Sequence, residues 1–160
     1  MKAAIIYTTK HGTTLKVASM INEMASGNAD LIDLKKTTTV NFDLYDKIII
    51  GGSIHAGKIQ RRVVKFCEKN MKELSDKPLG LYLSCMDEEK AQEQFNNAYP
   101  ETLRNHALSS KLTGGEVLFE RMNFLEKYIM KKIGKRTESI SNIKEDKVRE
   151  LALEMGLLNN

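Results

Sequence analysis

The sequence predicts an α/β fold in which helices cover both faces of a doubly wound, parallel sheet. Short apolar runs rich in β-type residues alternate with segments whose apolar residues recur at helical spacing. This alternation is typical of parallel strands joined by right-handed crossovers. Two of the runs are apolar throughout, as expected of central strands that are buried on both faces.

Four runs are predicted to be strands, and a weaker fifth run follows Gly114-Gly115. The four runs span residues 3–7, 31–34, 48–50 and 79–83, and the fifth spans 116–119. Segments 17–24, 59–67 and 148–155 each place apolar residues on one helical face. The stretch 88–107 is predicted to be helical with a break at Pro100, because proline lacks the N–H that a helix interior requires.

Length and composition indicate one domain over residues 1–160. The chain has 160 residues, of which 41% are hydrophobic and 29% charged, which is enough to build a full core. No apolar run reaches the roughly 18 residues that a membrane span needs, and no secretory segment is recognisable. Cys67 and Cys85 lack metal or CxxC spacing. We therefore expect a cytoplasmic protein with reduced thiols.

Three loops are expected at the carboxyl edge of the sheet, where open α/β sheets bind their ligands. They cover residues 8–14, 51–58 and 84–88. If the strand order is 2-1-3-4-5, these loops are neighbours in space. The first loop would then hold a phosphate, and the other two would form the walls of a slot.

The first loop has the composition of a phosphate site. N–H groups at the start of the following helix attract anions, threonine hydroxyls can donate, and Gly12 allows a close approach. Lys10 and His11 either add positive charge or lie exposed at the loop tip. The alternative is an ordinary cap by Thr13 or Thr14, which does not account for the other two loops. The loop residues are Thr8, Thr9, Lys10, His11, Gly12, Thr13 and Thr14.

Other classes that use related sheets lack their signatures here. A receiver domain needs acidic residues after the first and third strands, where this chain has Thr8 and Gly51-Gly52. A dinucleotide-binding domain needs GxGxxG after the first strand, and a P-loop nucleotidase needs Gly-Lys-Ser/Thr; both are missing. No nucleic-acid-binding motif accompanies the basic residues, so no nucleic acid is expected as a partner.

Positive charge is concentrated in residues 121–136. This segment holds six cations and one anion, a net +5, whereas the whole chain carries +4. Met122, Leu125, Ile129 and Ile133 would share one helical face. One interpretation is a helix that packs on the sheet with solvated lysines. The other is attraction to an anionic membrane surface or an anionic substrate.

The three loops resemble those of the flavodoxin family. Its phosphate loop has the pattern Ser/Thr-x-Thr-Gly-x-Thr, which Thr9, Gly12 and Thr14 match, with His11 in place of a threonine. The resemblance implies FMN as cofactor, a five-stranded sheet of order 2-1-3-4-5, and a flavin ring between the other two loops. The implied ring-contacting residues are Ser53, Ile54, His55, Ala56, Gly57 and Lys58 on one side, and Ser84, Cys85 and Met86 on the other.

Within this slot, Gly57 is the residue that the resemblance places against flavin N5. His55 and Met86 stand where the family usually has stacking aromatics. This difference indicates either an open flavin face that a substrate can reach or weak FMN binding, since stacking contributes to affinity. Cys85 is either a small residue chosen for space or a redox-active thiol beside the flavin.

Residues 51–57 and 119–136 are more specifically similar to the flavodoxin-like menaquinone-dependent protoporphyrinogen oxidase group. That group has a basic helical insertion, here at about 120–136. The similarity implies an FMN-dependent oxidoreductase without a catalytic side chain, because the chemistry occurs at the flavin. It also implies oxidation of a porphyrinogen coupled to a quinone, and peripheral contact with the inner face of the membrane through 121–136. The alternative is an electron-transfer protein that passes electrons between protein partners.

Overall fold

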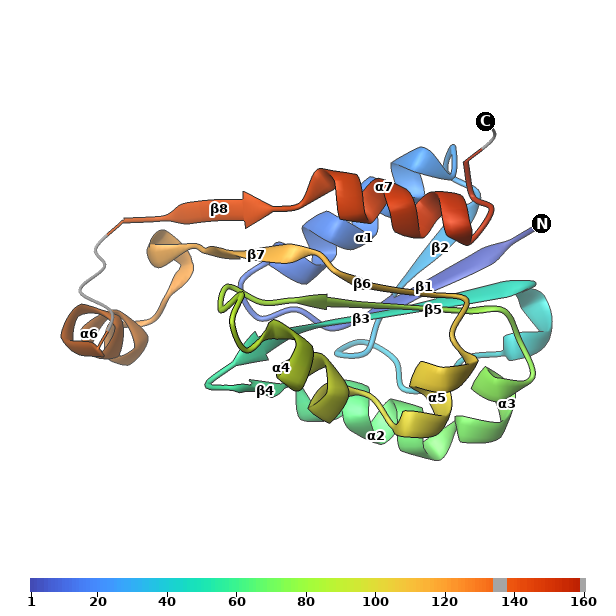
Figure 1. Ribbon diagram of the computed structural model, residues 1–160, viewed down its shortest axis with the longest axis horizontal. Helices are drawn as coiled ribbons and strands as arrows, with labels where there is room; N and C mark the ends of the chain where they lie inside the picture. Colours follow the sequence, from blue (N-terminus) through green and yellow to red (C-terminus); the bar gives the residue numbers. More distant parts are fainter. Residues whose placement is uncertain (134–137, 159–160) are drawn as a thin grey trace.

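Five parallel strands form the central sheet in the order β2-β1-β3-β5-β6 (Figure 1). The computed structural model describes residues 1–133 and 138–158. Counted along the chain without the hairpin strand β4, the order is 2-1-3-4-5, which confirms the predicted fold class. The strands are β1 (Ala3–Tyr7), β2 (Ala29–Asp33), β3 (Lys47–His55), β5 (Leu79–Ser84) and β6 (Ser109–Leu112).

Helices cover both faces of this sheet, as expected. On one face, Ile5 and Ile49 point toward α1 (Thr13–Met24) and α7 (Glu145–Glu154). On the other face, Ile6 and Ile50 point toward the remaining core helices. These four isoleucines are fully buried, because alternate residues of a strand face opposite layers. The helices of the second face are α2 (Arg61–Lys69), α3 (Met71–Ser75), α4 (Ala91–Ala98) and α5 (Glu101–His106).

The fifth parallel strand differs from the prediction. It is β6, with the sequence Ser-Ser-Lys-Leu, which pairs with β5 alone. An edge strand has one neighbour, so it can be short and polar, and its sequence lacks the apolar run that marks a central strand. The predicted run 116–119 begins instead in β7 (Gly114–Val117), which pairs antiparallel with β8 (Ile140–Ile143) in a separate two-stranded sheet.

One hairpin turn belongs to the site. The strand β3 reverses into β4 (Lys58–Ile59) through Ala56 and Gly57, whose φ angles are +49° and +76°. Positive φ at both central residues is the signature of a tight hairpin turn that matches strand twist. Pro100 separates α4 from α5 as predicted. The short 3₁₀ helix η1 (Phe42–Leu44) precedes β3.

Residues 114–133 and 138–143, which we call the arm, follow β6 and precede α7 in the chain and extend away from the sheet (Figure 1). The arm contains β7, the 3₁₀ helix η2 (Phe119–Arg121), α6 (Phe124–Ile133) and β8. Part of the predicted basic segment, residues 134–137, lies outside the described residues. No helix within 1–133 or 138–158 combines the length and apolar character that crossing a bilayer requires.

Candidate functional site

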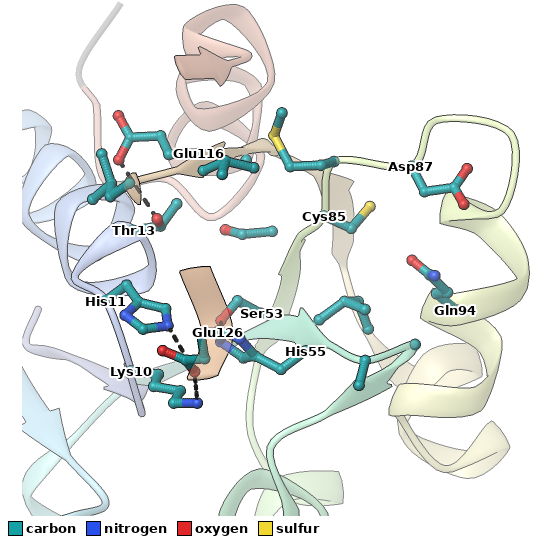
Figure 2. Close-up of a pocket in the computed structure, with 18 of the residues that line it drawn as sticks. Lys10, His11, Thr13, Ser53, His55, Cys85, Asp87, Gln94, Glu116 and Glu126 are labelled. Carbon is teal, nitrogen blue, oxygen red and sulfur yellow. Dashed lines mark hydrogen bonds and ion pairs between the residues drawn. The ribbon is translucent and has the colours of Figure 1, made fainter. Parts of the chain in front are cut away.

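A cavity of about 980 Å³ opens at the carboxyl edge of the sheet, where the three predicted loops meet (Figure 2). The loops after β1, β3 and β5 form its base and two sides, while α4 and the arm, including β7, complete the wall. The close approach of the three loops follows from the strand order, because β1, β3 and β5 are adjacent. The lining residues contributed by α4 and the arm include Lys90, Gln94, Glu116, Met122, Glu126 and Ile129.

The loop from β1 to α1 presents a helix N-terminus to this cavity. Gly12 is the N-cap of α1 with φ +106°, and no side chain caps the helix. Thr9 Oγ1 accepts a hydrogen bond of 2.9 Å from the Gly12 N–H. Among the described residues, the N–H groups of Thr13 and Thr14 have no acceptor. The first turn of α1 therefore offers free donors and the positive end of the helix dipole.

Thr14 carries a polar atom that lacks a partner. Its side chain is fully buried, and Oγ1 makes no hydrogen bond within the described part of the chain. A buried hydroxyl without a partner is destabilising unless a ligand supplies one. The loop thus fits an anionic group that accepts hydrogen bonds from the α1 N-terminus and from Thr14.

A hydrogen bond from the neighbouring strand holds this loop in place. Tyr82 of β5 is fully buried, and its hydroxyl donates to the Thr14 carbonyl oxygen at 3.0 Å. The ring of Tyr82 lies over Gly51 of β3, where a Cβ atom would come within 1.8 Å of Tyr82 Cζ. Gly51 is therefore needed for space, and β5 fixes the position of the first turn of α1.

The hairpin loop contributes a network of Ser53, His55 and Gln60. The Ser53 N–H donates to Gln60 Oε1 at 2.9 Å, Gln60 Nε2 donates to Ser53 Oγ at 2.6 Å, and Ser53 Oγ lies 3.1 Å from His55 Nε2. Burial, with smaller contributions from the charges of His11 and Lys10, lowers the pKa of His55 to about 4. The imidazole on this wall is therefore neutral at pH 7.

The third loop is anchored to the neighbouring backbone. The Cys85 N–H donates to the Gly114 carbonyl oxygen at 2.9 Å, and the hydroxyls of Ser84 and Thr113 are 3.0 Å apart. Burial, followed by the charge of Asp87, raises the pKa of the Cys85 thiol. A protonated thiol is a poor nucleophile, so these surroundings favour the space-filling interpretation of Cys85 over the redox-active one.

Charged groups from the arm contact the phosphate loop (Figure 2). Glu126 of α6 pairs with Lys10 and lies 3.5 Å from His11 Nε2. The hydrogen bond from Lys10 holds the pKa of Glu126 below its usual value. Arg121 of η2 donates to the His11 carbonyl oxygen at 2.9 Å. The arm thus covers the loop that would hold an anion.

A second arm carboxylate lies beside the start of α1. Glu116 of β7 accepts from Lys16 at 2.6 Å and from Ser141 at 2.7 Å, and lies 3.5 Å from Thr13 Oγ1. Burial acts to raise the pKa of Glu116, but the hydrogen bonds from Lys16 and Ser141 leave it below its ordinary value. Glu116 is therefore an anion with its charge balanced by Lys16.

Most of the chain matches a known protein family. The family model described as "Flavodoxin domain" matches residues 4–143. The chain belongs to the flavodoxin family. This family membership agrees with the order of the parallel strands and with the position of the cavity at their carboxyl ends.

Two curated relatives carry the name protoporphyrinogen IX dehydrogenase [quinone]. The protein from Leishmania major is 24% identical over 156 residues, covering 89% of this chain and 68% of its own length. The protein from Escherichia coli K12 is 22% identical over 157 residues, covering 92% of this chain and 87% of its own. At this level of identity, the names suggest a redox function without establishing the substrate.

Solved structures share the fold at low sequence identity. The flavodoxin of Streptococcus pneumoniae TIGR4 superposes with a TM-score of 0.56 at 14% identity, covering 98% of both chains. The rubredoxin:oxygen oxidoreductase of Desulfovibrio gigas superposes with a TM-score of 0.55 at 13% identity, covering 96% of this chain and 37% of that one. These similarities concern the flavodoxin-like fold alone.

Most of the predicted site residues line the cavity. Thr8, Gly12, Thr14 and Lys58 do not: Thr8 and Thr14 are buried below the loop, Gly12 caps α1, and Lys58 is exposed on the hairpin. Among the described side chains, no cluster of three or more His, Cys, Asp or Glu is arranged to hold a metal ion. The predicted residues that do line the cavity are Thr9, Lys10, His11, Thr13, Ser53, Ile54, His55, Ala56, Gly57, Ser84, Cys85 and Met86.

Several residues at the site carry no recognisable sequence signal. Gln60 follows the hairpin and belongs to no recognised motif. Its role becomes visible only through its two hydrogen bonds with Ser53. Glu116 falls in a segment that reads as a strand, and Arg121 is one of many cations in the basic segment. Only the path of the arm back across the phosphate loop brings Glu116 and Arg121 to the site.

Proposed function

We propose that this flavodoxin-family protein binds FMN in the cavity and acts as an FMN-dependent oxidoreductase. The observation that carries the proposal is the loop 8–14. Within the described part of the chain, the N–H groups of Thr13 and Thr14 and the Thr14 hydroxyl, all at the start of α1, have no partner. Membership of the flavodoxin family supports FMN as the cofactor. Bound FMN supplies redox chemistry that the side chains themselves lack.

The residues of this chain bind and orient the cofactor. Thr9 and Thr13 line the cavity at the position proposed for the phosphate, and Thr14 lies buried next to Thr13 in the first turn of α1. Lys10 also lines the cavity, where it pairs with Glu126. The hairpin 53–57 and the loop 84–86 face each other across the cavity and would hold the ring between them. Ile54 and Met86 give this slot apolar walls, which remove water from the ring.

Cofactor binding is tested on the purified protein. We expect flavin absorption bands, release of FMN on denaturation, and tighter binding of FMN than of riboflavin to the apoprotein. Hydrogen bonds to a charged phosphate contribute about 1.5–3 kcal/mol each, so FMN should bind at least tenfold more tightly. Equal affinities for the two flavins would contradict the role of the phosphate loop.

We further propose that the enzyme oxidises a porphyrinogen and passes the electrons to a quinone. The names of the two curated relatives support this reaction. The cavity also extends past the two ring loops to α4 and to Ile129 and Met130 of the arm, so it has space for a molecule besides the flavin ring. No side chain needs to act as a catalytic residue in this reaction, because the flavin carries out the redox chemistry. The side chains position the reactants around the cofactor.

A turnover assay separates this reaction from simple electron transfer. The FMN-loaded protein is mixed with protoporphyrinogen and a water-soluble menaquinone analogue, and porphyrin fluorescence is followed without oxygen. We expect quinone-dependent turnover. A protein that binds FMN but oxidises no porphyrinogen would instead be an electron carrier between protein partners.

The surface of α6 supports a peripheral contact with an anionic membrane. Phe124 is 87% exposed and Leu125 is 64% exposed, which is unusual for large apolar side chains on adjacent positions. Lys127, Lys131 and Lys132 lie on the same helix. An exposed apolar surface beside several cations is suited to the interface of an anionic bilayer.

Vesicle sedimentation tests this contact. We expect binding to anionic vesicles that weakens with salt, since each nearby lysine contributes on the order of 1 kcal/mol. Replacement of Lys131 and Lys132 by Gln should reduce binding without changing FMN content. The matched control replaces Lys65 and Lys69 of α2, which are also exposed. Equal binding of both double variants would favour a packed helix with solvated lysines.

A further inference from the structure

The hydrogen bonds around Ser53 fix the orientation of the Gln60 amide. The Ser53 backbone N–H can only donate, and its partner is Gln60 Oε1 at 2.9 Å. The amide oxygen of Gln60 is thereby fixed toward the backbone. The amide nitrogen, which can only donate, is left facing Ser53 Oγ at 2.6 Å. Ser53 Oγ therefore accepts a hydrogen bond from Gln60.

This arrangement bears on which nitrogen of His55 carries the proton. The Ser53 hydroxyl still has its own proton to donate, and its remaining partner among the described residues is His55 Nε2 at 3.1 Å. When the hydroxyl donates to this nitrogen, His55 Nε2 accepts. A neutral imidazole has one protonated nitrogen, so the proton of His55 lies on Nδ1.

The surroundings of His55 keep this ring neutral. Burial disfavours the charged form of His55, and electrostatic interactions with His11, Lys10 and Lys35 lower its pKa further, against the opposing charge of Glu126. The ring of His11 stands edge-on to His55, with centroids 5.6 Å apart. A neutral His55 on the cavity wall is therefore a fixed donor and not a cation.

We propose that Gln60 and Ser53 hold His55 in the Nδ1–H tautomer so that His55 donates a hydrogen bond to an acceptor atom of the flavin ring. His55 lines the cavity on the hairpin, and its Nδ1 has no partner among the described residues. An oxidised flavin edge carries carbonyl and imine acceptors that such a donor fits. This assignment rests on the proposed binding of FMN; Gln60 and Ser53 are positioning residues.

The tautomer is measured first, by long-range ¹H–¹⁵N NMR of the apoprotein at pH 8. We expect a protonated Nδ1 and an unprotonated Nε2 for His55, whose signals are assigned by their loss in His55→Ala. The reverse tautomer, or an even mixture of the two, would overturn the proposal. This measurement needs no ligand, so its failure is distinct from a failure to bind FMN.

The variant Gln60→Glu tests the positioning role without changing His55. A carboxylate accepts from both the Ser53 N–H and the Ser53 hydroxyl, so the hydroxyl no longer donates to His55. His55 should then move its proton to Nε2 and offer the cavity an acceptor. The control introduces Gln60→Glu into the variant Ser53→Ala, which lacks the hydroxyl that links residue 60 to His55. This double variant carries the added charge, but its His55 tautomer should be the same as in Ser53→Ala alone. An unchanged tautomer in Gln60→Glu alone would refute the positioning role.

Flavin titrations test the ligand contact. In His55→Ala, the dissociation constants of FMN and of riboflavin should both rise about two- to tenfold, the range for one neutral hydrogen bond. His55→Asn places an amide N–H close to the position of Nδ1 and should restore most of this affinity, whereas His55→Gln should not. Equal flavin affinities in all four proteins would overturn the contact. A wild-type protein that binds no flavin would refute the proposed function and the contact, leaving only the tautomer result.

Discussion

Replacement of Thr14 by Val should stabilise the apoprotein and weaken FMN binding. Val keeps the branched shape of Thr but replaces the hydroxyl with a methyl group. Thr14 Oγ1 is buried without a partner among the described residues, and burial of an unpaired hydroxyl costs about 1–3 kcal/mol. The free energy of unfolding of the apoprotein should therefore rise by about 1 kcal/mol or more.

The same change removes a donor to the phosphate. A hydrogen bond to a charged group contributes about 1.5–3 kcal/mol, so the dissociation constant of FMN should rise about 10- to 150-fold. Riboflavin, which lacks the phosphate, should bind the variant and the wild type equally. Urea unfolding of the apoprotein and flavin fluorescence titrations measure the two effects. A variant that is less stable, yet binds FMN as before, would refute the reasoning, because the hydroxyl would then have a partner inside the protein.

Three further predictions concern residues around the site. Lys58→Glu should lower the midpoint potential of the flavin in a potentiometric titration, because an added anion on the hairpin disfavours reduced, anionic flavin. The corresponding change in the free energy of reduction is about 1 kcal/mol or less, and an equal or higher potential would contradict the prediction. Gly51→Ala should lower the free energy of unfolding by about 1–3 kcal/mol or more in urea titrations, since the new Cβ would meet the ring of Tyr82. The lowered pKa of Glu126 means that its pairing with Lys10 stabilises the fold fully above pH 4.5 and is lost as the pH falls through the lowered pKa. Between pH 6 and pH 3 the thermal midpoint should therefore fall less in Glu126→Gln than in the wild type, and equal falls would count against the ion pair.

The sequence predicted the central strands and the position of the site because both depend on local patterns. Buried parallel strands are apolar along their whole length, so β1 and β3 are recognisable by composition. Once their order is known, the loops that follow them must meet at one edge of the sheet. The edge strand β6 was missed because Ser109–Leu112 is polar, with one pairing partner and little apolar surface to bury.

The side-chain network at the site could not be predicted in the same way. The link from Gln60 to His55 depends on the hairpin geometry at Ala56 and Gly57, where Ala56 adopts a positive φ that is rare for residues other than glycine. The contact between Lys10 and Glu126 joins residues that are 116 positions apart. Neither the period of a helix nor a local motif carries information about such a pairing.

The arm leaves and rejoins the core at almost the same point, which is the geometry expected of a segment that protein engineering could remove or exchange as a unit. Lys144 N donates to the Thr113 carbonyl oxygen at 2.9 Å, and Gly114 pairs with Ile143 immediately beyond. A short turn could close this gap, so insertion or loss of the whole arm need not disturb β6 or α7. Because Glu126 contacts Lys10, we expect a transplanted arm to dock better on a chain whose first loop carries a cation at that position.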